Sequence, residues 1–238
     1  MQLSEMFTSA RELAFRTARM ISILHWEKRG STLHMELLED LISKRINERP
    51  NHAVFVFPKP AALARRGIEE IGHSLPNFLD LFRPHHERFL VEDNLADASL
   101  GMEHTEKYWR YHPTTAEAYA ALDGQMPGDF IVLSGSLGDD IAGENPFNAR
   151  SMILADGGIP LDPFAVISVL FGINDLLAER CLWFDILGIE VSPKGDGRYD
   201  DTAYADRRGS SLVNLDWNWG KRKRSFRLAP YAFWPGRK

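Results

Sequence analysis

The segment from residue 212 to residue 219 constrains the fold more than any other part of the chain, because its apolar and polar residues alternate strictly. Val213, Leu215 and Trp217 fall on one side, and the polar residues between them fall on the other. This period of two is typical of a β-strand with one buried face. A second alternating run follows a glycine-containing connection, so the sequence predicts a β-hairpin formed by residues 212–219 and 226–228.

The connection of this predicted hairpin carries the most cationic stretch of the chain. Lys221, Arg222, Lys223 and Arg224 follow one another directly. At a hairpin tip, these four side chains would project into solvent. We therefore predict that they bind an anionic partner, which is either an acidic protein face or nucleic acid. With nucleic acid, each neutralised phosphate would release counterions and make binding steeply salt-dependent.

The formal net charge of −5 hides a strong partition along the chain. Residues 1–91 carry a net charge of +2, residues 92–206 carry −15, and residues 207–238 carry +8. Such asymmetry indicates that the acidic middle and the basic end have different partners, or that they are each other's partner. We expect a protein partner or self-association, with nucleic acid as the other candidate.

The composition, with 44% hydrophobic and 26% charged residues, is typical of an ordinary globular protein. No apolar run approaches the roughly 18 residues that a bilayer span requires. The amino terminus has acidic residues where a signal peptide would have a basic and then an apolar region. We therefore expect a cytoplasmic protein without a membrane partner. Cys181 is the only cysteine, which excludes an intramolecular disulfide.

The rest of the chain predicts helices interspersed with strands. Apolar residues spaced three and four apart predict a helix over residues 3–26 and a second over about residues 31–49, which would form an antiparallel pair. Strands are predicted at residues 53–57, 88–92, 129–133, 150–154 and 182–191. Further helices are predicted after a Thr114 and Glu117 capping box and after Asp162-Pro163, and a surface loop is predicted at residues 194–209.

Together these elements predict an α+β fold, with a mixed sheet, an amino-terminal helical pair and a carboxy-terminal antiparallel β-hairpin. Prolines flank the helix expected between residues 113 and 128. They suggest a boundary between an amino-terminal helical and α/β part (residues 1–112) and an α+β part that ends in the basic hairpin (residues 113–238). A single domain is an equal alternative.

A loop rich in glycine and acidic residues, residues 134–144, is the second candidate site. Its small residues would let backbone amides approach a phosphate, and its carboxylates would suit a hard cation such as Mg²⁺. It has neither the GxxxxGK[ST] arrangement of a P-loop nor the GxGxxG of a dinucleotide fold. The candidate phosphate-binding residues are Ser134, Gly135, Ser136 and Gly138, and the candidate catalytic or Mg²⁺-binding residues are Asp139, Asp140 and Glu144.

The string GDFIVLSGSLGDD, residues 128–140, resembles the glycine-rich segment of the aminoimidazole ribonucleotide synthetase family. The likeness covers only this string, because the chain has none of that family's amino-terminal lysine and acidic metal motifs. All eight histidines lie within the first 112 residues. The best-placed group, His104, Glu106 and His112, is more typical of a polar surface segment than of a metal site, which needs three or four convergent ligands. We predict no metal site there.

Two hypotheses about function follow from the sequence. The first is a non-enzymatic structural or binding subunit of a larger assembly, which engages an anionic partner through the basic terminal hairpin. The second is a metal-assisted hydrolase or nucleotide-using enzyme built on residues 134–144, with Mg²⁺ as its cofactor. The first needs no cofactor. The sequence leaves the substrate, the identity of the anionic partner and the oligomeric state open.

Overall fold

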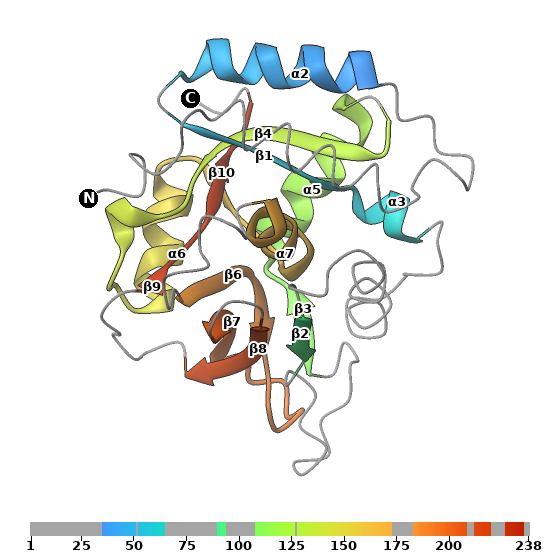
Figure 1. Ribbon diagram of the computed structural model, residues 1–238. Coiled ribbons are helices and arrows are strands. Elements are labelled where there is room, and N and C mark those ends of the chain that lie inside the picture. Colours follow the sequence, from blue (N-terminus) through green and yellow to red (C-terminus); the bar gives the residue numbers. More distant parts are fainter. Residues whose placement is uncertain are drawn as a thin grey trace.

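The computed structural model describes residues 35–50, 52–64, 90–93, 108–126, 128–172, 183–208, 212–219 and 227–235. The first predicted helix (residues 3–26) and the basic loop with Lys221, Arg222, Lys223 and Arg224 lie outside these residues. Within them, helices accompany two sheets, so the predicted α+β class is confirmed (Figure 1). The domain boundary between residues 112 and 113 stays a prediction.

The first sheet has four strands in the order β1-β4-β10-β5, and every pairing in it is antiparallel. Its central strand, β4, consists of buried apolar residues followed by small ones, which allows the close approach of β1 and β10. The second sheet has six strands and is mixed, because β2 pairs with β8, and β9 with β6, in parallel. The bounds are β1 (Ala53–Pro58), β2 (Leu90–Asp93), β3 (Trp109–Tyr111), β4 (Phe130–Ser136), β5 (Gly158–Pro160), β6 (Trp183–Val191), β7 (Asp201–Arg208), β8 (Leu212–Trp219), β9 (Arg227–Leu228) and β10 (Tyr231–Phe233).

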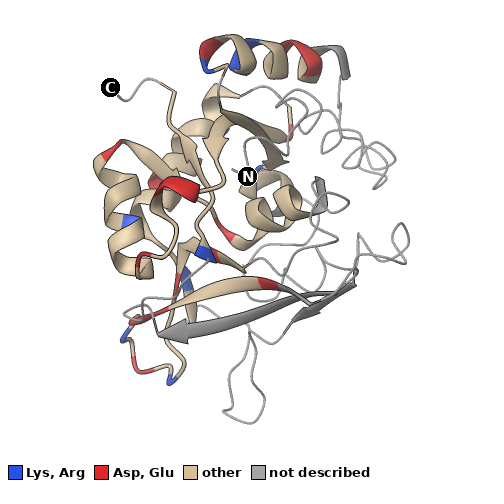
Figure 2. Ribbon diagram, turned by 60° about the vertical axis from the view of Figure 1, so that its left-hand side comes forward, with Lys and Arg blue, Asp and Glu red and all other residues tan. Residues whose placement is uncertain are grey.

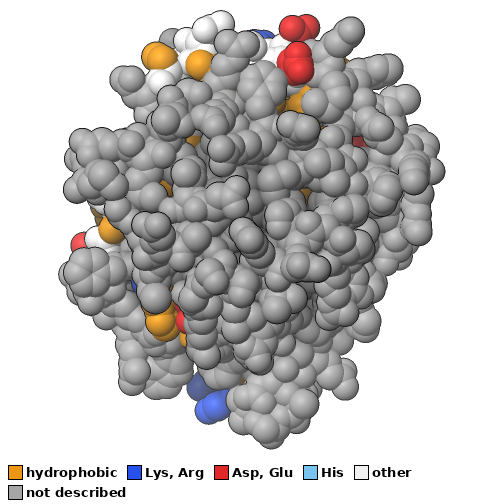
Figure 3. Space-filling view, in the orientation of Figure 1, with side chains coloured by type: hydrophobic (Ala, Val, Ile, Leu, Met, Phe, Trp, Pro, Cys, Tyr) orange, Lys and Arg blue, Asp and Glu red, His pale blue; other side chains and the backbone are white. Residues whose placement is uncertain are grey.

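Two helices determine how the sheets are covered. The apolar helix α7 packs against β1 and against β6, so it lies between the two sheets (Figure 1). Helix α2 packs on β4 and β1 and turns its exposed Glu39 and Asp40 outward, where acidic side chains are visible at the surface (Figure 3). The helices are α2 (Met35–Glu48), α3 (Pro60–Ala64), α5 (Pro113–Gln125), the 3₁₀ helix η6 (Asp139–Ile141), α6 (Pro146–Ala155) and α7 (Pro163–Gly172).

The antiparallel hairpin near the carboxy terminus is present, but its strands differ from those predicted. β8 pairs with β7 on one side and with β2 on the other, which leaves neither edge for residues 226–228. Arg227 and Leu228 form β9 instead, beside β6. The predicted surface loop at residues 194–209 was therefore wrong for Asp201–Arg208, because these residues form β7, which pairs with β8, and Ala203 and Ala205 are buried in the core.

Two local predictions were wrong because capping residues were overlooked. Residues 150–154 belong to helix α6, which begins at Pro146 after the side chain of Asn145 accepts a hydrogen bond from the Asn148 amide. Helix α5 was expected, but His112 caps it, since its Nδ1 accepts from the Thr114 amide at 3.3 Å. The predicted box of Thr114 and Glu117 is therefore not used.

A break in strand β6 joins the two sheets. The ladder between β6 and β7 is interrupted between Ile186 and Val191. Inside this break, the Gly188 amide donates to the Leu161 carbonyl at 2.8 Å, and a Cβ at Gly188 would lie 2.5 Å from the Leu161 carbonyl carbon. Arg150 of α6 then donates from Nε to the Leu187 carbonyl at 2.9 Å and from Nη2 to the Ile189 carbonyl at 2.8 Å. A buried arginine thus replaces the missing strand partner.

Asp162 confirms the helix start that the sequence predicted. Its Oδ1 accepts from the Ala165 amide at 2.8 Å, and its Oδ2 accepts from the Tyr111 hydroxyl at 3.0 Å. Burial raises the pKa of this carboxyl to about 6, although the hydrogen bonds it accepts act in the opposite direction. Desolvation therefore outweighs the hydrogen bonds, and the charged form of Asp162 is less favoured in the folded protein than in water.

The contact between Gly188 and Leu161 gives a stability prediction. In Gly188→Ala the new Cβ would collide with backbone atoms of Leu161 and Asp162, which cannot move aside as the end of a side chain could. We therefore expect the free energy of unfolding to fall by about 1 to 3 kcal/mol. Gly124→Ala is the matched control, because nothing lies within 4 Å of its Cβ and it sits in α5. It should gain about 0.5 kcal/mol. Urea denaturation measures both, and equal effects would contradict the predicted close approach.

The pKa of Asp162 gives a pH dependence. Its pKa is about 6 in the folded protein and 3.8 otherwise, so the folded state binds more protons between these values. Stability should fall as pH rises from about 4 to about 6, by about 2 to 3 kcal/mol. Asp162→Asn should flatten this slope.

Asp201, whose pKa burial also raises to about 6, adds a slope of the same sign, so the comparison must be between Asp162→Asn and wild type. Denaturant unfolding at several pH values gives the measurement. An unchanged slope in Asp162→Asn would show that this carboxyl is not the responsible group.

Candidate functional site

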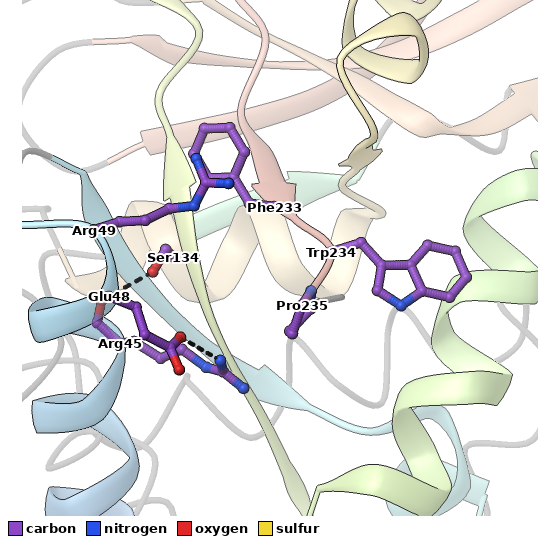
Figure 4. Close-up of a pocket in the computed structure, with 7 residues that line it drawn as sticks. All are labelled: Arg45, Glu48, Arg49, Ser134, Phe233, Trp234 and Pro235. Atoms are coloured by element: carbon purple, nitrogen blue, oxygen red, sulfur yellow. Dashed lines mark hydrogen bonds and ion pairs between the residues drawn. The ribbon is translucent and has the colours of Figure 1, made fainter. Parts of the chain in front are cut away.

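A pocket of about 220 Å³ opens where helix α2 ends beside the last strand, β10 (Figure 4). Helix α2 and the residue after it supply one wall with three charged side chains, and the end of β10 supplies the opposite wall. Strand β4 contributes Ser134 between them. The lining residues are Arg45, Glu48, Arg49, Ser134, Phe233, Trp234 and Pro235.

Arg45 is the structural part of this pocket. Its side chain is almost fully buried, and its Nε donates to the Val132 carbonyl of β4 at 3.0 Å. Its Nη1 forms an ion pair with Glu48 at 2.6 Å. The Ser134 hydroxyl donates to the Arg45 carbonyl at 3.1 Å. Arg45 and Ser134 therefore fix the end of α2 on β4, and both are already engaged by the protein.

Arg49 differs from Arg45 because its charge is not neutralised. Its guanidinium carbon lies 4.0 Å from the centre of the Phe233 ring, a cation–π contact, and the side chain has no ion pair or hydrogen bond with any residue that the structure describes. Figure 4 shows the two side chains alongside each other at the rim. The ring holds the guanidinium in place while leaving its N–H donors available to a ligand.

The pKa of His52, at the same rim, depends on partial burial and on the charges of Arg49 and Asp140. Its ring meets the Phe233 ring edge to face, with 4.7 Å between centroids. Partial burial lowers the pKa of His52, the charge of Arg49 lowers it further, and the charge of Asp140 raises it by a smaller amount. The effect of Arg49 thus exceeds that of Asp140 here. Basic and acidic positions are interspersed along α2 itself (Figure 2).

The four predicted phosphate-binding residues lie in β4 and in the turn that leads into η6. Ser134 and Gly135 lie within strand β4, where Gly135 is buried and a Cβ on it would collide with Phe55. The Ser136 hydroxyl accepts from the Gly138 amide at 3.0 Å. Gly138 has a φ of 82° and packs on the backbone of Ala229. Only Ser134 of these residues lines the pocket.

The predicted acidic residues do not converge either. Asp140 accepts from the Tyr231 hydroxyl at 2.9 Å and from the Ser136 hydroxyl at 3.4 Å. Burial, with the contact to Asp140, raises the pKa of Tyr231 to about 12. Asp139 is exposed in η6, and Glu144 accepts from the Asn148 side chain at 3.4 Å. Among the described residues, no group of three His, Cys, Asp or Glu side chains is placed to hold a metal ion.

Arg227, in the basic carboxy-terminal part of the chain, does not present its charge to solvent. It is buried in an ion pair with Asp185 at 2.6 Å. Its guanidinium also lies 4.3 Å from the centre of the Tyr204 ring. Its charge is therefore used inside the protein.

Sequence reasoning singled out Ser134 but missed the arginines of the pocket. One indication was available, because Arg45 continues the apolar stripe of α2 marked by Leu38 and Ile42, at helical spacings of four and three residues. An arginine at a core position needs buried partners. The sequence did not indicate that Phe233, far away in the chain, would meet Arg49.

Comparisons of this chain with protein families, with curated proteins and with solved structures found no match. In the parts of the chain that the structure describes, there is no helix of the length and apolar character that a membrane span requires.

Proposed function

We propose that this chain is a non-enzymatic binding subunit of a larger cytoplasmic assembly and that its pocket engages an anionic group of a partner. The observation that carries this proposal is Arg49, a guanidinium positioned on the Phe233 ring with no ion pair to any other described residue. Guanidinium groups present planar pairs of N–H donors that match carboxylates and phosphates. An anion at this rim would find a positive potential and oriented donors.

The size of the pocket favours a binding function over the turnover of a metabolite. Pockets for whole small-molecule ligands measure about 300–1,000 Å³. This pocket, at about 220 Å³, is below that range. It suits one side chain or terminal group of a larger partner, while the rest of that partner lies on the surface around it.

The charge distribution supports a second contact with the same kind of partner. Residues 207–238 carry a net charge of +8, and the four consecutive cations from Lys221 to Arg224 lie in this region. Residues 92–206 carry −15, so the acidic part of a second copy is one surface that they would attract. An acidic protein face is the partner we favour, and nucleic acid is the alternative outcome of the test below.

Propionate, a mimic of a glutamate side chain, tests the pocket directly. We expect it to shift the Arg49 Nε–H and Trp234 indole resonances saturably in ¹⁵N NMR spectra. Arg49→Gln should weaken this binding at least about tenfold, because Arg49 is the one described cation of the pocket that is not ion-paired. Arg198→Gln, at an exposed arginine in the connection between β6 and β7, is the matched control and should bind as wild type does. The absence of saturable shifts in wild type would contradict the proposal.

The basic loop needs a separate test. We expect that replacing Lys221, Arg222, Lys223 and Arg224 with Ser leaves the thermal unfolding temperature unchanged and weakens association with poly-L-glutamate. Duplex DNA is the second arm of the experiment. If DNA bound more tightly than polyglutamate and the quadruple variant lost a few units of log-log salt slope, nucleic acid would be the partner class instead. Unchanged association in both arms would remove the loop from the proposal.

A further inference from the structure

We infer that the pocket accepts a singly charged carboxylate and that Glu48 excludes doubly charged phosphate groups. This inference rests on the proposed function, because it specifies which anion the same pocket takes. It identifies the partner group as an acidic side chain or terminal carboxylate of a polypeptide. The reasons are the charges that line the pocket, the partners that those charges already have, and the apolar wall opposite them.

Among the described residues that line the pocket, only one positive charge has no ion-pair partner. Arg45 is paired with Glu48 at 2.6 Å and also donates to the Val132 carbonyl, so the pair is formally neutral. Arg49 then gives the described lining residues a formal net charge of +1. A carboxylate brings the site to neutrality, whereas a phosphate monoester with about −1.5 to −2 charges leaves it negative.

Glu48 and the end of α2 oppose the second negative charge. The Glu48 side chain is 42% exposed and lines the pocket beside its partner Arg45. It is the last residue of α2 and so lies in the last turn, where helix carbonyl groups place a partial negative charge of about half a unit. The Arg45 carbonyl in this turn already accepts from the Arg49 amide and the Ser134 hydroxyl. The Glu48 carboxylate and the carbonyl groups at the end of α2 would therefore repel a second negative charge on a bound anion.

The opposite wall suits the stem of an acidic side chain. Phe233, Trp234 and Pro235 line it, and each is only partly buried. Methylene groups of a glutamate or of a chain terminus would pack on this apolar surface while the carboxylate reaches Arg49. A backbone phosphodiester is flanked by sugars on both sides and cannot insert in this way.

A comparison of two anions tests the inference. Propionate and inorganic phosphate are titrated into the full chain at pH 8, where phosphate is a dianion, at matched ionic strength, with the Arg49 Nε–H and Trp234 indole resonances as readouts. We expect propionate to bind at least about threefold more tightly than phosphate in the wild-type protein. Glu48→Gln should raise the affinity for phosphate by about threefold or more and leave that for propionate within about twofold.

The outcomes separate this inference from the proposed function. Phosphate binding as tight as propionate in wild type, or an unchanged ratio in Glu48→Gln, would overturn carboxylate selectivity and leave an anion pocket in place. Saturable binding of neither anion would overturn the proposed function, and the inference with it. Glu39→Gln, at an exposed acidic position elsewhere on α2, is the control for a general change in charge and should keep the wild-type ratio.

Discussion

The backbone contact between Gly188 and Leu161 is the constraint on which the rest of the structure depends. It brings the second sheet against the junction of β5 and α7, so that α7 is enclosed between the two sheets. Such an approach is possible only without a side chain at residue 188. The break in β6 that permits it leaves carbonyls without strand partners, and Arg150 supplies two of the missing donors.

Buried arginines recur at the joints of this fold. Arg150 serves the break in β6, Arg45 attaches α2 to β4, and Arg227 attaches β9 to β6 through Asp185. Burial lowers the pKa of Arg150 to about 10, with Glu190 acting in the opposite direction, so this guanidinium stays charged at neutral pH. Removing the partner of a buried charge costs several kcal/mol, which makes each joint specific. These arginines are counted among the positive charges of the chain, but they are buried and add no positive charge to its surface.

The pocket follows from the same architecture. β10 inserts between β4 and β5, and this places Phe233 at the end of a strand close to where α2 finishes. Arg45 binds α2 to β4 through its hydrogen bond to the Val132 carbonyl. Arg49, four residues later, extends past the end of the helix onto Phe233. One helical turn therefore separates a structural arginine from an available one.

The sequence by itself determined the α+β class, the existence of strands β1, β4, β6 and β8, and the start of α7 at Asp162, because each depends on local periodicity or on one capping group. It did not determine which strands pair. The alternation of β8 does not specify its partners. In the structure β8 pairs with β7 and with β2, whereas Arg227 and Leu228 pair with β6. The tertiary structure alone also decided which cations are available, since burial and ion pairing depend on residues far apart in the chain. The sequence gives no reason to treat Arg227 and Arg49 differently. In the structure, Arg227 forms a buried ion pair with Asp185, whereas Arg49 lines a pocket.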